Sequence, residues 1–327
     1  MNALERSWYQ PFGWSWLLLP LSWLFGALSR LRRWLFRTGL KASHRLPVPV
    51  IVVGNITVGG TGKTPVTLWL CEFLQAQGLK PGIVSRGYGV KLTAPKLIDV
   101  AKDTPATVGD EPFLLATRSG CPVVVCPDRV GAAQALYLAT GCNVIISDDG
   151  LQHYALSRDL EIILLDGDRG VGNGLLLPAG PLREGIWRLK GADVVLSNTT
   201  PHPLAHWTFA LQAEPARSLL NQHFELAVGS PVTLVSGIGN PQRFSRSAAH
   251  LGYAVQSSHF FADHYAFTVE DLANLSGSIL MTEKDAVKCR PFAKPDWFYL
   301  PVTAQLPQPA IDAIAEKLQQ LRSRYGV

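Results

Sequence analysis

The 327-residue sequence has few charged side chains, 17% of the total, and it has neither a low-complexity tract nor an internal repeat at solenoid spacing. Its 29 glycines and 23 prolines follow no collagen-like period. These absences exclude a disordered, fibrous or repeat protein. The chain is instead 47% hydrophobic, which is enough to bury one large core or two modest ones.

Cysteine is also scarce. The five cysteines are odd in number and scattered, without the CxxC pairs or neighbouring histidines that a zinc site would show. Cys71 and Cys142 stand in apolar runs, where a thiol behaves as a small hydrophobe. We interpret the cysteines as reduced and structural, as is typical of a cytosolic protein.

Positive charge is missing from most of the chain and gathered at its start. Residues 1–45 carry seven bases and one acid, whereas the rest of the chain carries 23 bases and 24 acids. A near-neutral body disfavours a general nucleic-acid surface. The basic segment predicts a local anionic partner such as lipid headgroups.

The N-terminal segment combines this charge with an apolar run. No charged residue occurs between Ser7 and Ser29, and five of the nine tryptophans lie in the first 34 residues, a bias expected at lipid headgroup level. One alternative is a buried core helix, since the run is shorter than the roughly 20 residues of a membrane span, and we expect Pro20 to kink it. A signal peptide fits worse, because its charge should precede the apolar run. We favour an interfacial or partly inserted helix that places four arginines on anionic lipid: Arg30, Arg32, Arg33 and Arg37.

A glycine-rich loop follows a run of β-branched residues that ends at Val53, and it precedes a helical pattern from Val66 to Leu74. This order of strand, loop and helix predicts a phosphate-binding loop, in which main-chain amides and Lys63 contact phosphate and Thr64 offers a hydroxyl to Mg²⁺. The generic motif has glycine where this chain has Thr57. The predicted nucleotide-binding residues are Thr57, Val58, Gly59, Gly60, Thr61, Gly62, Lys63 and Thr64.

Paired carboxylates end a second hydrophobic strand. Asp148 and Asp149 follow the run NVIIS and precede GLQHY, so they are candidates to hold Mg²⁺ beside the phosphates. Asp166 and Asp168, after EIILLDGD, are the alternative pair. We favour the first pair because Gln152 and His153 add polar groups there; helix capping or a turn is the structural alternative for either pair.

Three further clusters are candidates. Asp110 and Glu111 precede an apolar helix, where they either cap it or approach a hydroxyl nucleophile. Arg129 opens another helix, an unfavourable place for a cation unless it serves an anion. Arg183 and Glu184 lie in a loop rich in proline and glycine, where arginine can clamp phosphate.

The alternation of strands and helices predicts an α/β fold with a doubly wound parallel sheet of the P-loop type. The pattern restarts after residue 228. We therefore expect a membrane-associating segment over 1–45, a P-loop core domain over 46–228 and a smaller α/β domain over 229–327, with the site between the two domains. The SGIGNP loop in the smaller domain is interpreted as a tight turn.

The motifs, taken in order, resemble those of the tetraacyldisaccharide 4'-kinases, the lipid A 4'-kinases of Gram-negative bacteria. They cover most of the chain and comprise GNITVGGTGKTP, SRGYG, VGDEP, DDGLQHY, LLPAGPLREG, FADHYAF and MTEKDAVK. Thr57 is normal for that family. The resemblance implies ATP- and Mg²⁺-dependent phosphorylation of the 4'-hydroxyl of a tetraacyldisaccharide 1-phosphate, giving lipid IVA, at the cytoplasmic face of the inner membrane.

The resemblance also implies residue roles. Asp110 would act as catalytic base with His264 as its dyad partner, and Lys63, Thr64, Asp148 and Asp149 would handle phosphate and metal. Other residues fall in motifs associated with the site: Arg129, Gln152, His153, Arg183 and Glu184.

A membrane-associated P-loop ATPase switch without a sugar acceptor is the alternative that the residues alone leave open. A GTPase is disfavoured, because VVLSNTT lacks the lysine and acid of a guanine-specificity segment. The sequence does not indicate an oligomeric state.

Overall fold

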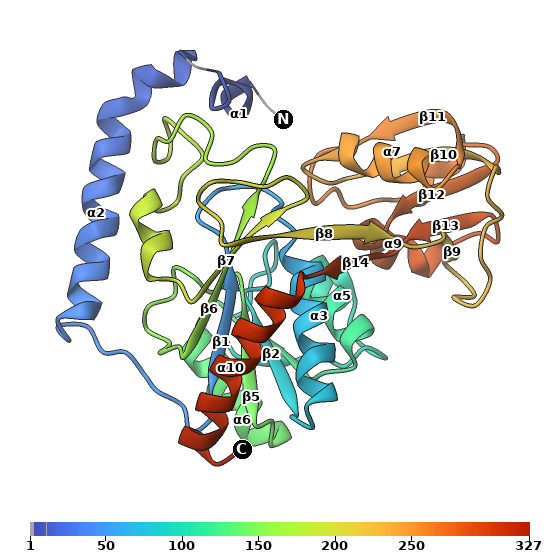
Figure 1. Cartoon of the computed structure of the whole chain (residues 1–327). Helices are drawn as coiled ribbons and strands as arrows, with labels where there is room; N and C mark the ends of the chain where they lie inside the picture. The colour runs from blue at the N-terminus through green and yellow to red at the C-terminus, as the bar shows by residue number, and fades with distance from the viewer. Residues whose placement is uncertain (1–2, 11) are drawn as a thin grey trace.

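The computed structural model describes residues 3–10 and 12–327. Two units, each built around a sheet, lie side by side, and an N-terminal helix runs along the far side of the larger one (Figure 1). We call the larger unit the core unit and the other the small unit. The predicted α/β fold is confirmed.

The core unit holds a nine-stranded sheet in the order β14-β8-β7-β6-β1-β5-β2-β4-β3. The seven strands from β8 to β4 are parallel, and the two edge strands are antiparallel. Runs of Val, Ile and Leu, buried on both faces, explain the parallel arrangement. The strands are β1 (Val50–Gly54), β2 (Pro81–Ser85), β3 (Lys96–Leu97), β4 (Val123–Val125), β5 (Val144–Asp148), β6 (Leu160–Asp166), β7 (Val194–Asn198), β8 (Trp207–Ala213) and β14 (Val302–Gln305).

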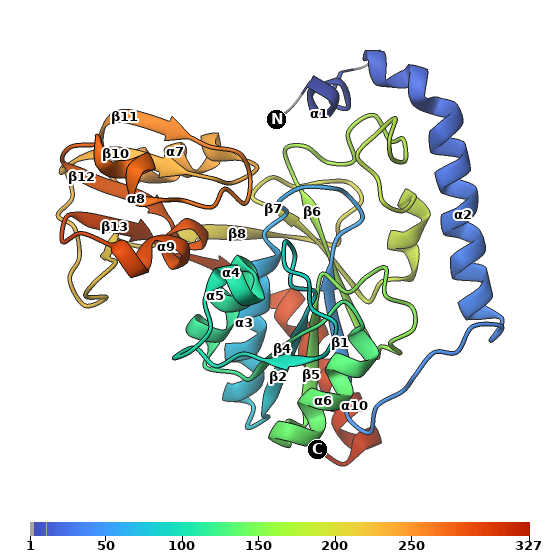
Figure 2. The ribbon, with the colours of Figure 1, turned by 180° about the vertical axis from the view of Figure 1, so that it is seen from behind.

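Helices cover both faces of this sheet, as a doubly wound fold requires (Figure 2). Apolar side chains of α3 (Lys63–Ala76), α5 (Asp110–Ser119) and α10 (Gln308–Tyr325) form the main core on one face. On the other face α6 (Arg129–Thr140) packs against the strands. A short helix, α4 (Pro105–Val108), precedes α5, and a 3₁₀ helix spans Ile186–Gly191.

The small unit holds a five-stranded sheet in the order β11-β10-β12-β13-β9. Its helix α9 (Glu283–Cys289) packs on α5 of the core unit. The strands are β9 (Arg217–Ser218), β10 (Pro231–Ser236), β11 (Ala254–Phe260), β12 (Ser278–Thr282) and β13 (Trp297–Leu300). The helices are α7 (Pro241–His250), α8 (Val269–Ala273) and α9 (Glu283–Cys289), followed by the 3₁₀ turn Arg290–Phe292.

The two sheets do not follow the expected division of the chain, in which residues 46–228 form one domain and residues 229–327 the other. β9 lies before residue 229 yet joins the small sheet, whereas β14 and α10 return to the core unit. β14 pairs with β8, and Ile314 and Leu318 of α10 are buried in the main core. A local pattern shows that a strand exists but not which sheet it joins, so sequence periodicity misses this return.

The N-terminal segment contains α1 (Ala3–Ser7), a 3₁₀ turn (Trp14–Leu18) and α2 (Leu19–Arg37). Pro20, where we expected a kink, lies in the first turn of α2, where it blocks no hydrogen bond and does not interrupt the helix. The inward face of α2 is small and polar: Ser22 donates to the carbonyl of Leu176 at 2.6 Å, and Gly26 packs on the same residue.

The apolar side of α2 faces outward. Trp23 is 71% exposed, and Leu24 and Leu28 are more than half exposed. The buried-core alternative is therefore wrong, since a core helix would bury exactly these side chains. No helix within the described residues is long and apolar enough to cross a membrane.

Candidate active site

The glycine loop, residues 57–64, joins β1 to α3, as the sequence predicts. Gly62 has a φ of +92°, and a side chain there would press on Asn198 and Phe209 at 3.2 Å. Asn198 in turn donates its amide to the carbonyl of Thr61 at 3.3 Å. The first amides of α3 have no partner within the helix and carry its positive dipole end, so the loop presents donors suited to an anion.

Lys63 begins α3 and reaches across the loop. Its ammonium lies 3.4 Å from the side-chain oxygen of Asn55 and 3.6 Å from a carboxylate oxygen of Asp149. Asp149 also receives two hydrogen bonds, at 3.0 and 3.1 Å, from one guanidinium nitrogen of Arg183. Burial would raise the pKa of Asp149, but Lys63 and Arg183 outweigh it and lower that pKa.

Asp148 is buried at the end of β5, next to β1. Its carboxylate accepts a hydrogen bond from the hydroxyl of Ser85 at 3.1 Å. Burial, followed by the charges of Glu111 and Asp149, raises its pKa to about 7. The positive charges of Lys63 and Arg129 therefore do not offset the effect of burial and of the neighbouring carboxylates on Asp148.

The alternative pair at the end of β6, Asp166 and Asp168, makes contacts with other residues of the protein. Asp166 accepts from the main-chain amides of Asp168 and Arg169, each at 3.1 Å, and from Arg243 of the small unit at 3.0 Å. The hydroxyl of Thr200 donates to Asp168. These contacts fix a loop and join the two units, so the geometry favours Asp148 and Asp149 as the metal carboxylates.

Asp110 and His264 meet across the two units. Asp110 is buried at the start of α5, and His264 lies in the loop after β11 with a φ of +60°. Nδ1 of His264 is 3.2 and 3.1 Å from the two oxygens of Asp110. The ring of Tyr88 lies 4.7 Å from that of His264.

Each member of this pair changes the ionisation of the other. Burial alone would raise the pKa of Asp110, but the hydrogen bond from His264 and the charge of Lys284 outweigh it and lower the pKa to about 2. The pKa of His264 is raised, chiefly by the hydrogen bond to Asp110. As the pH falls, His264 therefore takes up a proton before Asp110 does.

Glu111 and Lys284 extend the same group. The ammonium of Lys284, on α9, lies 2.9 Å from Glu111 and 3.8 Å from Asp110. Sequence reasoning did not include Lys284 among the candidate site residues. The signal available was its place in the motif MTEKDAVK, where a lysine after a threonine cap resembles an ordinary helix start.

The remaining candidates lie behind Asp148 and Asp149. Arg129 is buried and donates to the carbonyl of Asp148 at 2.9 Å, and burial lowers its pKa to about 10. The side chain of Asp128 caps α6, and its negative charge offsets the unfavourable effect of a cation at that helix start. Burial, followed by the charges of Arg129, Arg86 and Arg32, lowers the pKa of His153 to about 4, so its imidazole is neutral.

Gln152 connects two loops around the site. Its amide donates to the carbonyl of Asn55 and to the carboxylate of Glu184, both at 3.2 Å. Glu184 is buried and also accepts from the hydroxyl of Tyr154. Gln152 and Glu184 thus brace the loop that carries Arg183.

Comparison with known proteins supports one family. The model of the LpxK family, tetraacyldisaccharide-1-P 4'-kinase, matches residues 14–319. The chain belongs to this family. The tetraacyldisaccharide 4'-kinase of Shewanella frigidimarina is 49% identical over 98% of this chain and 96% of its own length, and that of Tolumonas auensis is 46% identical over 99% and 100%. A crystal structure of LpxK from Aquifex aeolicus in complex with ATP has 28% identity and a TM-score of 0.76, covering 95% of this chain and 99% of that one.

Membership of the LpxK family confirms the resemblance found in the sequence, and the solved LpxK structure confirms the fold class. The roles of individual residues stay predictions. For them the structure supplies positions: the glycine loop and the paired aspartates lie in the core unit, and His264 approaches Asp110 from the small unit.

Proposed function

We propose that this chain transfers the γ-phosphoryl group of ATP to the 4'-hydroxyl of a tetraacyldisaccharide 1-phosphate, giving lipid IVA for lipid A. The proposal rests on the connection between two groups of residues: the Asp110–His264 pair with Glu111, and the glycine loop with Asp148 and Asp149. Glu111, beside the Asp110–His264 pair, is close enough to Asp148 to raise its pKa, and Asp149, next to Asp148, contacts Lys63 of the glycine loop. We therefore place the proton acceptor and the phosphate-binding loop in one electrostatically connected site, as a kinase requires.

The residues have distinct tasks in this reaction. Main-chain amides of residues 57–64 and the ammonium of Lys63 hold the triphosphate. The 4'-oxygen forms a bond to the γ-phosphorus while the bond to the bridging oxygen breaks and ADP leaves. The hydroxyl proton passes to the carboxylate of Asp110. In a loose transition state the proton leaves late, so a weak base that is well placed suffices.

Mg²⁺ fits the residues present. Asp148 and the hydroxyl of Thr64 would hold the ion, with Asp149 beside them, and the ion would neutralise phosphate charge. The raised pKa of Asp148 indicates a carboxylate that a cation would stabilise. The described residues contain no cluster of three or more His, Cys, Asp or Glu for a metal, which agrees with an ion held by one or two carboxylates together with phosphate and water.

The proposal extends to the membrane. Residues 1–45 would lie on the cytoplasmic face of the inner membrane, with exposed Trp23, Leu24 and Leu28 in the interface and the basic residues on anionic lipid. The acyl chains of the substrate keep it in that bilayer, so the enzyme meets it there. A peripheral attachment agrees with the short apolar run.

The kinase assay uses full-length protein, ATP, Mg²⁺ and tetraacyldisaccharide 1-phosphate in detergent micelles, with mass analysis of the lipid. We expect a mass gain of one phosphate and ATP turnover that depends on the lipid. Turnover indifferent to lipid, with no mass gain, would favour the ATPase-switch alternative.

Vesicle binding tests the membrane surface. A W23Q/L24Q/L28Q variant should bind vesicles that contain anionic lipid about 10³-fold more weakly, since each of the three large apolar side chains contributes roughly 1.5 kcal/mol or more on burial. Leu138→Gln is the matched control, because Leu138 is 80% exposed on α6. Equal losses in both variants would contradict the proposed surface.

A further inference from the structure

Lys284 occupies a central place between the two units. It lies in the first turn of α9, its side chain is only 16% exposed, and Thr282 caps the helix. Its ammonium is 2.9 Å from Glu111, 3.3 Å from Nε2 of His264, 3.5 Å from Asp263 and 3.8 Å from Asp110. One cation thus touches both members of the dyad and two further carboxylates.

Hydrogen-bond chemistry decides what these contacts mean for His264. An ammonium group can only donate, so Nε2 of His264 must accept from Lys284 through its lone pair. The proton of the neutral imidazole then lies on Nδ1, where it donates to Asp110. If the proton were on Nε2, two donors would face each other at 3.3 Å.

The surrounding charges keep Lys284 protonated. Burial would lower its pKa, but Glu111, Asp110 and Asp263 outweigh burial and raise it. The other groups that face the pair are Tyr88, whose ring lies on His264, and Lys288, whose ammonium is 2.7 Å from Asp285. The charge of Lys284 favours an ionised Asp110 and opposes protonation of His264.

We propose that Lys284 is a positioning residue of the dyad: its ammonium holds the imidazole of His264 with the proton on Nδ1, facing a deprotonated Asp110. This inference rests on the proposed kinase function, in which Asp110 accepts the hydroxyl proton. Lys284 acts through His264 and Asp110.

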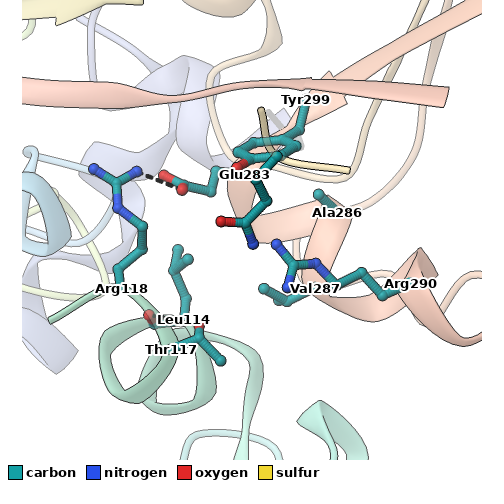
Figure 3. A pocket seen from close by; sticks show the side chains of 9 residues that line it. Leu114, Thr117, Arg118, Glu283, Ala286, Val287, Arg290 and Tyr299 are labelled. Carbon is teal, nitrogen blue, oxygen red and sulfur yellow. Dashed lines mark hydrogen bonds and ion pairs between the residues drawn. The ribbon is translucent and has the colours of Figure 1, made fainter. Parts of the chain in front are cut away.

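A second ion pair on the same two helices provides a control. Arg118, at the end of α5, pairs with Glu283, the residue before Lys284, beside a small cavity (Figure 3). This pair also joins the core unit to the small unit, but no described contact links it to Asp110 or His264. The double substitution R118M/E283Q removes it without leaving an unpaired buried charge.

The first test is the pH dependence of kcat in the lipid kinase assay. We call the fall of kcat on the acid side of the pH profile the acid limb. Without the ammonium, His264 should protonate at a higher pH, because a neighbouring charge shifts a pKa by about 1 unit or more. We therefore expect the acid limb of Lys284→Met to lie about one pH unit higher. Lys284→Arg keeps the charge and should return the limb toward its original pH. R118M/E283Q should leave the limb unmoved.

The second test measures the tautomer directly by ¹⁵N NMR of the histidine rings, with His264 assigned by a His264→Gln variant. We expect the Nδ1–H tautomer in the unmodified chain and a population of Nε2–H in Lys284→Met. An unchanged tautomer and limb in Lys284→Met, an equal shift in R118M/E283Q, or no recovery in Lys284→Arg would overturn the inference. If the unmodified chain does not phosphorylate lipid, the proposed function fails instead; the NMR result for Lys284 still stands.

Discussion

The two halves of the candidate site are assembled differently. The phosphate half is local: the glycine loop and Asp148 end neighbouring strands of one sheet. The dyad half is distant: Asp110 and His264 are 154 positions apart and come from different units. The first half therefore forms whenever the core unit folds, whereas the second also depends on how the two units pack.

This contrast assigns different chemistry to each half. The phosphate half combines positive charge, from Lys63 and helix amides, with Asp148, whose pKa is raised to about 7 by burial and by the charges of Glu111 and Asp149. The dyad half holds His264, whose pKa is raised chiefly by the hydrogen bond to Asp110. Substitutions in either half should therefore change the pH profile, through Asp148 in the phosphate half and through His264 in the dyad half.

The largest effect is expected for Asp110→Ala. Loss of a general base should lower kcat by roughly 10² to 10⁴ with little change in the affinity for ATP, measured by steady-state kinetics and nucleotide binding. Glu270→Gln, which changes an exposed acid in the first turn of α8, is the control and should keep full activity. A normal kcat in Asp110→Ala would reassign this residue to the start of α5 and remove the dyad from the comparison.

A smaller effect is expected for Lys63→Met. Removing this positive charge from the phosphate half should cost roughly 10² to 10³ in kcat, measured by steady-state kinetics. The exposed Lys80→Met is the matched control. A normal kcat in Lys63→Met, equal to that of Lys80→Met, would remove Lys63 from the phosphate half.

Sequence reasoning succeeded where the structure is local. The strand, glycine loop and helix around Lys63 are contiguous, and their pattern predicted the observed geometry because each element is specified by its own residues. The helices that open at Asp110 and Arg129 were predicted for the same reason.

It failed where placement depends on tertiary packing. The return of β14 and α10 to the core unit cannot be read from their own periodicity, which suits either sheet. The pairing of Asp110 with His264 entered only through the family resemblance, and Lys284 was missed, because its partners come from α5 and from the loop after β11.

The pH dependence of the unmodified enzyme should give a still smaller, graded effect. The pKa of His264 is raised above its ordinary 6.5, so kcat should begin to fall as the pH drops through a value above 6.5, up to about tenfold per unit. Protonated His264 places a full positive charge beside Asp110 and weakens it as a proton acceptor. A profile flat down to pH 5 would contradict a titrating dyad half.

The smallest effect is expected at the other contact between the units. Arg243→Met removes the pair with Asp166, at 3.0 Å, which joins α7 to the end of β6. We expect a loss of about 1 kcal/mol in the free energy of unfolding and a nearly unchanged kcat, because this contact holds the units together without touching Asp110 or Lys63. Arg246→Met is the control, since its side chain is 70% exposed and 4.0 Å from Asp168. A hundredfold drop in kcat for Arg243→Met alone would place the end of β6 in the chemistry and return Asp166 to the candidates for holding Mg²⁺.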